Sequence, residues 1–270
     1  MVKNGFKGGT RLFVDLKIWE DLLKSNRFLV FAGPCAVENL EQIIETAKIV
    51  KDSGAVGLRG GAFKPRTRPE SFQGLGEEAL KYLALAKAET GLLVVTEVID
   101  EDSLNKALPV ADILQVGSRN MQNYALLKLL AKVDKPVLLK RGLAATLEEW
   151  LGAVAYLEKG GNRKIILCER GIRTFETMTR NTLDISAVPL LKKLTPYPVI
   201  VDPSHAAGRR DIIPSLAKAA VAAGADGLLI EIHPEPERAL SDGQQSLNFQ
   251  EYEQLINELK PWVHVAGKRL

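Results

Sequence analysis

The stretch DIIPSLAKAAVAAGADGLLIEI, residues 211–232, carries the pattern that decides the fold. Its first part has apolar residues at helical spacing and ends in glycine, a residue that commonly ends helices. Its second part, GLLIEI (227–232), is almost continuously apolar, which is typical of a parallel strand covered on both faces. A helix followed directly by a buried strand is the repeating unit of an α/β protein.

The same unit recurs along the whole chain. We expect strands at 28–32, 56–59, 92–97, 112–116, 136–140, 164–168, 198–202 and 227–232. We expect helices at 39–54, 76–90, 101–108, 122–132, 147–159, 182–193, 211–227 and 249–259. Eight strand–helix units with short returns predict a closed (β/α)8 TIM barrel rather than an open doubly wound sheet.

Length and composition agree with one such barrel. The chain has 270 residues, which is near the usual length of this fold. Its hydrophobic and charged fractions, 46% and 26%, are ordinary for a globular protein and exclude a disordered chain. We expect the barrel over residues 27–270, preceded by a short N-terminal extension with one strand and one helix over residues 1–26.

Charge, cysteine content and hydropathy limit what the protein binds. A net charge of +3 and an aromatic content of 6% exclude a dedicated nucleic-acid binder. Two cysteines cannot form a disulfide framework, so a cytoplasmic location is expected. No stretch reaches the roughly 18 apolar residues of a membrane span, so no membrane partner is expected.

Reactive side chains follow the end of every predicted strand, where barrels of this kind build their active sites. Six of them are cations: Arg59, Lys64, Arg66, Arg119, Lys140 and Arg170. Guanidinium and ammonium groups match carboxylate and phosphate, so this set predicts a small phosphorylated or carboxylated substrate. A solvated rim of salt bridges is the alternative interpretation.

A second group of residues has the chemistry of metal ligands. It consists of Cys35, His205, Glu231 and Asp242. They follow the first, seventh and eighth strands, which are neighbours in a closed barrel, and they suit a divalent Mn, Fe, Co, Zn or Cu ion. Each also has a structural interpretation, because a cysteine is often a small buried hydrophobe and an aspartate before glycine often makes a turn. Cys168 is expected in the core, and His233 is a possible further ligand.

A series of short motifs in order along the chain resembles one family. The motifs are GPCAVE (33–38), GLRGGAFKPRT (57–67), SFQGLG (71–76), TEV (96–98), QVGSRNMQN (115–123), LLKRG (138–142), ERG (169–171) and VDPSHAAGRR (201–210). With Glu231 and Asp242, they resemble the 3-deoxy-D-arabino-heptulosonate 7-phosphate (DAHP) synthases in their short, single-barrel type Iβ form. The resemblance covers residues 28–260. It implies an aldol-like condensation of phosphoenolpyruvate with erythrose 4-phosphate, the first step of the shikimate pathway.

The resemblance also implies individual roles. The implied metal ligands are Cys35, His205, Glu231 and Asp242. The implied phosphoenolpyruvate binders are Arg59, Lys64, Ser118 through its backbone, Arg119, Lys140 and Arg170. Arg66 and Thr67 would hold erythrose 4-phosphate, and the family suggests a homotetramer or homodimer. Among the catalytic residues, which include Cys35 and His205, we expect Lys64 to be the general acid, with a pKa depressed by burial. Glu97 is expected either to orient Lys140 or to guide the attacking water.

Other functions stay open at this stage. The related 3-deoxy-D-manno-octulosonate 8-phosphate synthases accept arabinose 5-phosphate and carry a Lys-Ala-Asn-Arg-Ser type segment where this chain has Lys64-Pro65-Arg66-Thr67. Their metal-independent forms have Asn where this chain has Cys35. A metal-free aldolase would form a Schiff base on Lys140, and a barrel that only binds ligands would release no phosphate. The regulatory and mutase domains of longer DAHP synthases have no counterpart in the sequence, so feedback inhibition by aromatic amino acids through them is not expected.

Overall fold

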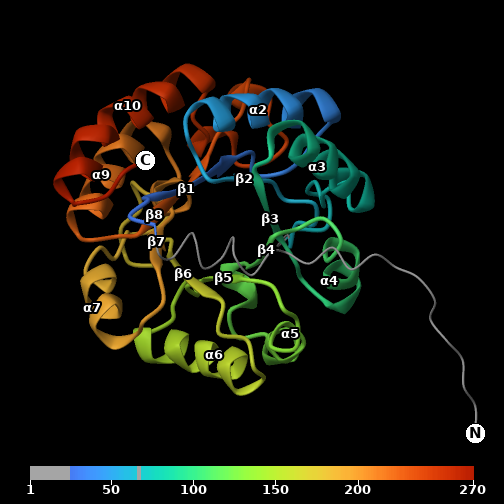
Figure 1. Cartoon of the computed structure of the whole chain (residues 1–270), viewed down its shortest axis with the longest axis vertical. Helices are drawn as coiled ribbons and strands as arrows, with labels where there is room; N and C mark the ends of the chain where they lie inside the picture. The colour runs from blue at the N-terminus through green and yellow to red at the C-terminus, as the bar shows by residue number, and fades with distance from the viewer. Residues whose placement is uncertain (1–24, 66–67) are drawn as a thin grey trace, which may run out of the picture.

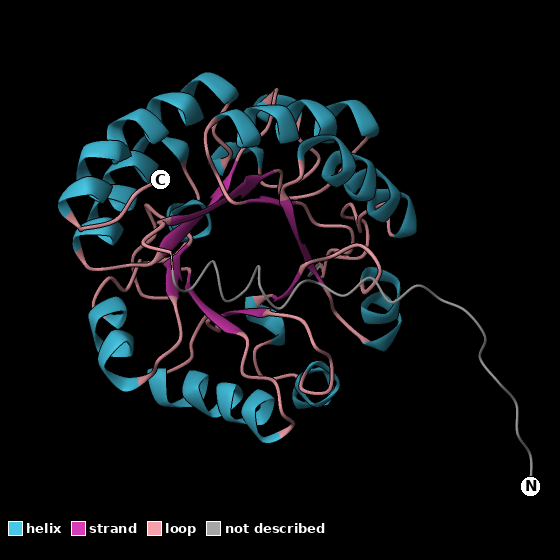
Figure 2. Cartoon of the chain, in the orientation of Figure 1, coloured by secondary structure: helices cyan, strands magenta, loops and turns pink. Residues whose placement is uncertain are grey.

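The computed structural model describes residues 25–65 and 68–270. Within these ranges eight parallel strands form a closed barrel in chain order, and the helices surround it (Figure 1; Figure 2). The predicted (β/α)8 barrel is therefore confirmed. The expected extension over residues 1–26 lies outside the described residues except for its last two. No helix within the described ranges is long and apolar enough to cross a membrane.

Every predicted strand is present, with its ends within one residue of the expected positions. The strands are β1 (Leu29–Gly33), β2 (Gly57–Arg59), β3 (Leu93–Glu97), β4 (Ile113–Val116), β5 (Val137–Lys140), β6 (Ile165–Glu169), β7 (Val199–Val201) and β8 (Gly227–Glu231). The α-helices are α2 (Leu40–Asp52), α3 (Glu77–Thr90), α4 (Glu101–Ala107), α5 (Tyr124–Leu130), α6 (Leu147–Lys159), α7 (Ala187–Leu194), α8 (Pro203–Ala207), α9 (Ile213–Ala222) and α10 (Phe249–Val265). Short 3-10 helices are η1 (Ser118–Asn120), η2 (Arg210–Ile212), η3 (Pro236–Arg238) and η4 (Gly243–Gln245).

The short helix α8 is absent from the sequence-based prediction, because five residues are too few to show a helical period. Its first turn is fixed by Asp202, whose side chain accepts a hydrogen bond from the backbone N–H of His205, and by Pro203 at the first position. Gly208, in the left-handed conformation at φ 69°, ends it. The sequence thus places His205 on a capped helical turn directly above β7.

Three other helices differ from the prediction by more than two residues at one end. The one expected over 211–227 ends at Ala222. The helix expected over 182–193 begins only at Ala187, because Thr182 forms a backbone bridge with Ile172, with both N···O distances 2.9 Å. This bridge closes the long loop after β6. The helix expected to end at 259 continues to Val265.

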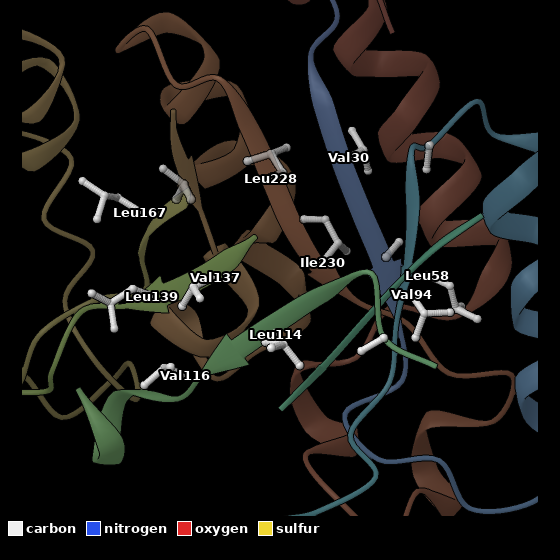
Figure 3. Close-up of a cluster of buried hydrophobic side chains, with 14 of the residues drawn as sticks. Val30, Leu58, Val94, Leu114, Val116, Val137, Leu139, Leu167, Leu228 and Ile230 are labelled. Atoms are coloured by element: carbon white, nitrogen blue, oxygen red, sulfur yellow. The ribbon is translucent and has the colours of Figure 1, made fainter. Parts of the chain in front are cut away.

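Side chains along the strands alternate between two hydrophobic layers. Those facing outward pack under the helices, and Figure 3 shows several of them, including Val30, Leu58 and Leu228. Those facing inward fill the barrel and are Leu29, Phe31, Val56, Val95, Ile113, Leu138, Ile166, Cys168, Ile200 and Leu229. Cys168 is therefore a core residue, as predicted. The next inward position along each strand lies at the C-terminal mouth of the barrel.

The barrel closes where β1 pairs with β8, in a register that runs from Leu29 opposite Gly227 to Gly33 opposite Glu231. The two backbones approach closely at the start of this pair. A Cβ atom on Gly227 would lie 2.0 Å from the carbonyl oxygen of Leu29. Only glycine fits at that contact.

We expect Gly227→Ala to lower the free energy of unfolding by about 1–3 kcal/mol, because β1 cannot retreat from the new methyl group without opening the barrel. The midpoint of urea denaturation, followed by circular dichroism, measures this. Gly152→Ala is the matched control: this exposed residue lies inside α6 with nothing within 4 Å of its added Cβ. Alanine should stabilise that helix by up to about 1 kcal/mol. Equal midpoints for the two variants would contradict the close β1–β8 contact.

Candidate active site

Polar side chains occupy the inward positions at the C-terminal mouth of the barrel. They are Arg59, Glu97, Gln115, Lys140, Arg170, Asp202 and Glu231, all buried. Strand periodicity places them directly above the inner core residues. Most of them line a polar cavity that opens to solvent. The set contains three cations and three carboxylates, so its formal charges balance.

Strand alternation separates neighbours that the sequence could not tell apart. Lys140 and Arg170 line the cavity, whereas Arg141 and Glu169 face the other way. Arg141 Nη1 donates hydrogen bonds to Glu169 Oε2 (3.0 Å) and Asp184 Oδ2 (2.7 Å). Arg141 and Glu169 therefore hold the loop after β6 in place rather than face the cavity.

Two of the predicted cations are neutralised by protein carboxylates. Arg59 Nη1 donates to Glu231 Oε1 at 2.7 Å, and Lys140 Nζ donates to Asp202 Oδ2 at 2.6 Å. Both pairs are buried. Asp202, which directly follows β7, holds Lys140, so the expectation that Glu97 orients Lys140 is wrong. Glu97 Oε2 instead accepts a hydrogen bond from Gln115 Nε2 at 3.3 Å.

The remaining predicted cations of the described chain line the cavity without a carboxylate partner among residues 25–65 and 68–270. They are Lys64, Arg119 and Arg170. Arg170 Nη1 is buried and has no hydrogen-bond partner there, and burial lowers the pKa of Arg170. A buried guanidinium nitrogen without a partner is costly, so it indicates a place for an anion. Ser118 lies beside Arg119 at the start of η1 and lines the same cavity.

Lys64 reaches the cavity from the loop after β2. Its Nζ donates to the carbonyl oxygen of Cys35 at 2.9 Å. Gly61 makes room for it, since a Cβ there would lie 2.8 Å from Lys64 Cδ. Burial lowers the pKa of Lys64, but interactions with Cys35 and Glu97 outweigh burial, and the net pKa is raised. The expected depressed pKa is therefore wrong, and Lys64 carries its proton at neutral pH.

The structure brings the four predicted metal ligands together. One donor atom from each of Cys35, His205, Glu231 and Asp242 lies within 4.8 Å of the others. Asp242 Oδ2 lies 3.2 Å from Cys35 Sγ and 3.8 Å from His205 Nε2, and Glu231 Oε1 lies 3.4 Å from His205 Nε2. A thiol, an imidazole and two carboxylates in one buried cluster fit a divalent transition-metal ion. His233 lies apart from this cluster, with Nε2 3.4 Å from Glu38 Oε2.

A buried carboxylate, Asp202, prepares His205 as a ligand. Asp202 Oδ2 lies 2.7 Å from His205 Nδ1, which leaves Nε2 directed at the cluster. Burial raises the pKa of Asp202, but His205 and Lys140 outweigh burial and hold it well below its usual range. Burial lowers the pKa of His205, so the neutral imidazole that a metal requires is the favoured form.

The sequence missed the loop between β6 and α7. Arg173, Arg180 and Asn181 of this loop line the cavity. The sequence-based prediction took only residues at the end of the sixth strand and none from the loop that follows it. The useful signal was the run IRTFETMTRN (172–181), which lacks helical spacing and holds two arginines. The predicted acceptor residues Arg66 and Thr67 lie outside the described residues.

At the C-terminal mouth of this (β/α)8 barrel, cations without a carboxylate partner among the described residues lie beside a cluster of potential metal ligands. This arrangement defines a class: an enzyme for small anionic substrates. The sequence profile of the DAHP synthetase I family matches residues 22–264. The chain is 53% identical over 243 residues to phospho-2-dehydro-3-deoxyheptonate aldolase of Thermotoga maritima, covering 90% of this chain and 72% of that protein. The chain belongs to the DAHP synthetase I family.

Solved structures agree with this assignment. The crystal structure of the Thermotoga maritima DAHP synthase matches with a TM-score of 0.87 at 52% identity, covering 90% of this chain and 71% of that one. A truncated form of the synthase from the same organism matches with a TM-score of 0.85 at 49% identity, covering 90% and 89%. A 2-dehydro-3-deoxyphosphooctonate aldolase of Nitrobacter winogradskyi is 33% identical over 250 residues, covering 85% and 86%.

We expect both cysteines to resist thiol reagents in the folded, metal-free protein. Burial, with the charges of Glu231 and Asp242, raises the pKa of Cys35 to about 12, and burial also raises that of Cys168. At pH 8 both groups are therefore protonated thiols, whereas the thiolate is the reactive form. Titration with Ellman's reagent should find no fast-reacting thiol in the native protein and two in denaturant. One rapid equivalent in the native protein would contradict the buried Cys35.

Proposed function

We propose that this chain condenses phosphoenolpyruvate with erythrose 4-phosphate and water to give 3-deoxy-D-arabino-heptulosonate 7-phosphate and phosphate, the first step of the shikimate pathway. One observation carries the proposal: Lys64, Arg119 and Arg170 lack carboxylate partners in the described chain and line the same cavity as two members of the four-ligand cluster, His205 and Asp242. The identity of 53% to a phospho-2-dehydro-3-deoxyheptonate aldolase, against 33% for the octonate aldolase, favours erythrose 4-phosphate as acceptor.

The cavity suits the two anionic substrates. The phosphate of phosphoenolpyruvate would bind Arg119, Lys140 and Arg170, with the backbone of Ser118 beside it, since charge-assisted hydrogen bonds to phosphate are strong. Arg59 and Lys64 complete the phosphoenolpyruvate site. Erythrose 4-phosphate would bind through Arg66 and Thr67.

One divalent ion would be held by the four clustered residues, Cys35, His205, Glu231 and Asp242. Mn, Fe, Co, Zn and Cu all suit this mixed donor set. When bound, such an ion supplies a Lewis acid for the aldehyde oxygen of the acceptor. The residues around it prepare the site, because burial favours the neutral form of His205 and Asp202 orients its ring.

The reaction forms a bond between C3 of phosphoenolpyruvate and the aldehyde carbon of erythrose 4-phosphate. Lys64, which is protonated at neutral pH, donates the proton that the aldehyde oxygen needs to become a hydroxyl. Positioned proton transfer of this kind contributes about 10²–10⁴-fold to a rate. Water then adds at C2, and phosphate leaves by C–O cleavage while Arg119, Lys140 and Arg170 neutralise its charge.

The Schiff-base alternative has less support. A lysine must lose its proton before it can attack a carbonyl carbon. Lys140 is buried, and its Nζ donates to Asp202 Oδ2 at 2.6 Å, so this nitrogen is engaged by a carboxylate rather than free to attack a carbonyl. Lys140 therefore suits an anion-binding role better than a nucleophilic one.

Cytoplasmic location and a homodimeric or homotetrameric assembly also belong to this proposal. Both cysteines are free and buried, which agrees with a reducing compartment. Light scattering on the purified protein reports the assembly.

We expect phosphate release from phosphoenolpyruvate with erythrose 4-phosphate and not with arabinose 5-phosphate. Treatment with EDTA should reduce it to background, and Mn²⁺ should restore it. Preference for arabinose 5-phosphate would support the octulosonate alternative. Full activity in EDTA with a borohydride-trapped adduct on Lys140 would support the Schiff-base aldolase. No release with either sugar would leave a binding module.

We expect Arg170→Met to lower kcat/KM for phosphoenolpyruvate by about 10–100-fold, because a charge-assisted hydrogen bond contributes roughly 1.5–3 kcal/mol. Steady-state kinetics at saturating erythrose 4-phosphate measure this. Arg163→Met, at an exposed position outside the cavity, is the control and should leave kcat/KM unchanged. Equal values for both variants would remove Arg170 from the proposed site.

A further inference from the structure

We propose that Arg180 and Gln245 are positioning residues that together fix the two carboxylates of the four-ligand cluster for a divalent ion. The inference rests on the proposed metal site and concerns residues that form none of its predicted ligands. Arg180 comes from the loop after β6, and Gln245 ends η4 in the loop after β8. The two loops meet beside Glu231 and Asp242.

The side-chain amide of Gln245 lies between Arg180 and Glu231, and only one of its two orientations satisfies both neighbours. Its side chain is fully buried, its Nε2 donates to Glu231 Oε2 at 2.5 Å, and its Oε1 accepts from Arg180 Nη1 at 2.8 Å. A guanidinium can only donate and an ionised carboxylate can only accept. Arg180 therefore sets the orientation of the amide, because the flipped amide would place oxygen against carboxylate and NH₂ against guanidinium.

The same nitrogen of Arg180 also holds the second carboxylate. Arg180 Nη1 donates to Asp242 Oδ1 at 3.1 Å. This contact leaves Oδ2 of Asp242 facing Cys35 Sγ and His205 Nε2. Asp242 has a left-handed backbone at φ 56°, a conformation that a non-glycine residue adopts at a cost. An external contact that fixes this side chain is therefore useful.

Arg180 is itself anchored to the helix that carries the third ligand. Its backbone N–H donates to the carbonyl of Ala207 at 2.9 Å, and the side chain of Asn181 donates to the carbonyl of His205 at 3.0 Å. The contact is close, because a Cβ on Gly208 would lie 2.3 Å from Arg180 Cβ. Arg180 thus connects α8 to both carboxylates of the β8 side.

Two effects of removing Arg180 have opposite signs, which makes the proposal testable. A guanidinium next to a cation site repels the cation, so loss of its charge alone would tighten metal binding. Loss of positioning would weaken binding instead, and partners of metal ligands typically contribute 10–100-fold to affinity. The rival role is direct contact with a substrate anion, since Arg180 lines the cavity and its side chain is 31% exposed.

The experiment measures the Kd of Mn²⁺ without substrate, from the electron paramagnetic resonance signal of free Mn²⁺. The variants are Arg180→Met, Gln245→Met and the double variant. We expect each single variant to raise Kd by about 10–100-fold and the double variant to raise it by less than the product, because both act through one chain of contacts. Arg209→Met removes an exposed arginine paired with Asp211 at 2.7 Å and should leave Kd unchanged.

Several results would overturn the proposal. Unchanged or tighter Mn²⁺ binding in both single variants would do so, as would an Arg180→Met protein that changes only the KM of a substrate. Circular dichroism verifies folding, and Gln245→Met, which preserves side-chain volume, decides the matter if Arg180→Met does not fold. A wild-type protein that binds no Mn²⁺ would overturn the metal site as well, whereas equal Kd values overturn the positioning role alone.

Discussion

The structure depends on a simple constraint. Successive side chains on a strand point to opposite faces of the sheet, and in a closed barrel one of those faces points inward to the barrel axis. Leu138 fills that axis from β5, and the next inward residue, Lys140, lies where the axis opens. The same step carries β6 from Cys168 to Arg170. The hydrophobic core and the site are therefore successive layers of one arrangement, and the packing that closes the barrel also positions the reactive groups.

Charged side chains buried at the C-terminal mouth of the barrel must be neutralised by other charged groups of the protein. Arg59 is compensated by Glu231 and Lys140 by Asp202, so the inner layer is stable without a ligand. The remaining cations gain most from an incoming phosphate. Among them is Arg170, whose buried Nη1 has no hydrogen-bond partner in the described part of the chain. Asp202 serves twice, since it neutralises Lys140 and aims His205. A substitution at Asp202 would therefore disturb both the anion site and the imidazole.

The barrel could be predicted from sequence because each strand is a continuous apolar run and each run is followed by reactive residues. Cys35, His205, Glu231 and Asp242 could be grouped because barrel order makes their strands neighbours. Two features could not be predicted: the face of the strand on which a polar side chain lies, and the contacts between loops. Consecutive residues such as Lys140 and Arg141 are equally polar, and only the register of the strand separates them. Arg180 and Gln245 lie well away from any strand end, and their contacts with carboxylates arise from how two loops fold against each other.

The facing of Lys140 and Arg141 has a consequence for how such a protein can diverge. Removing one residue within β5 would turn Lys140 outward under the helices and bring its neighbour to the axis. An insertion or deletion in a strand therefore moves its charged residues off the axis, whereas one in a loop leaves them in place. Changes in the loops can therefore alter what the cavity accepts, while the charged residues on the strands keep their positions.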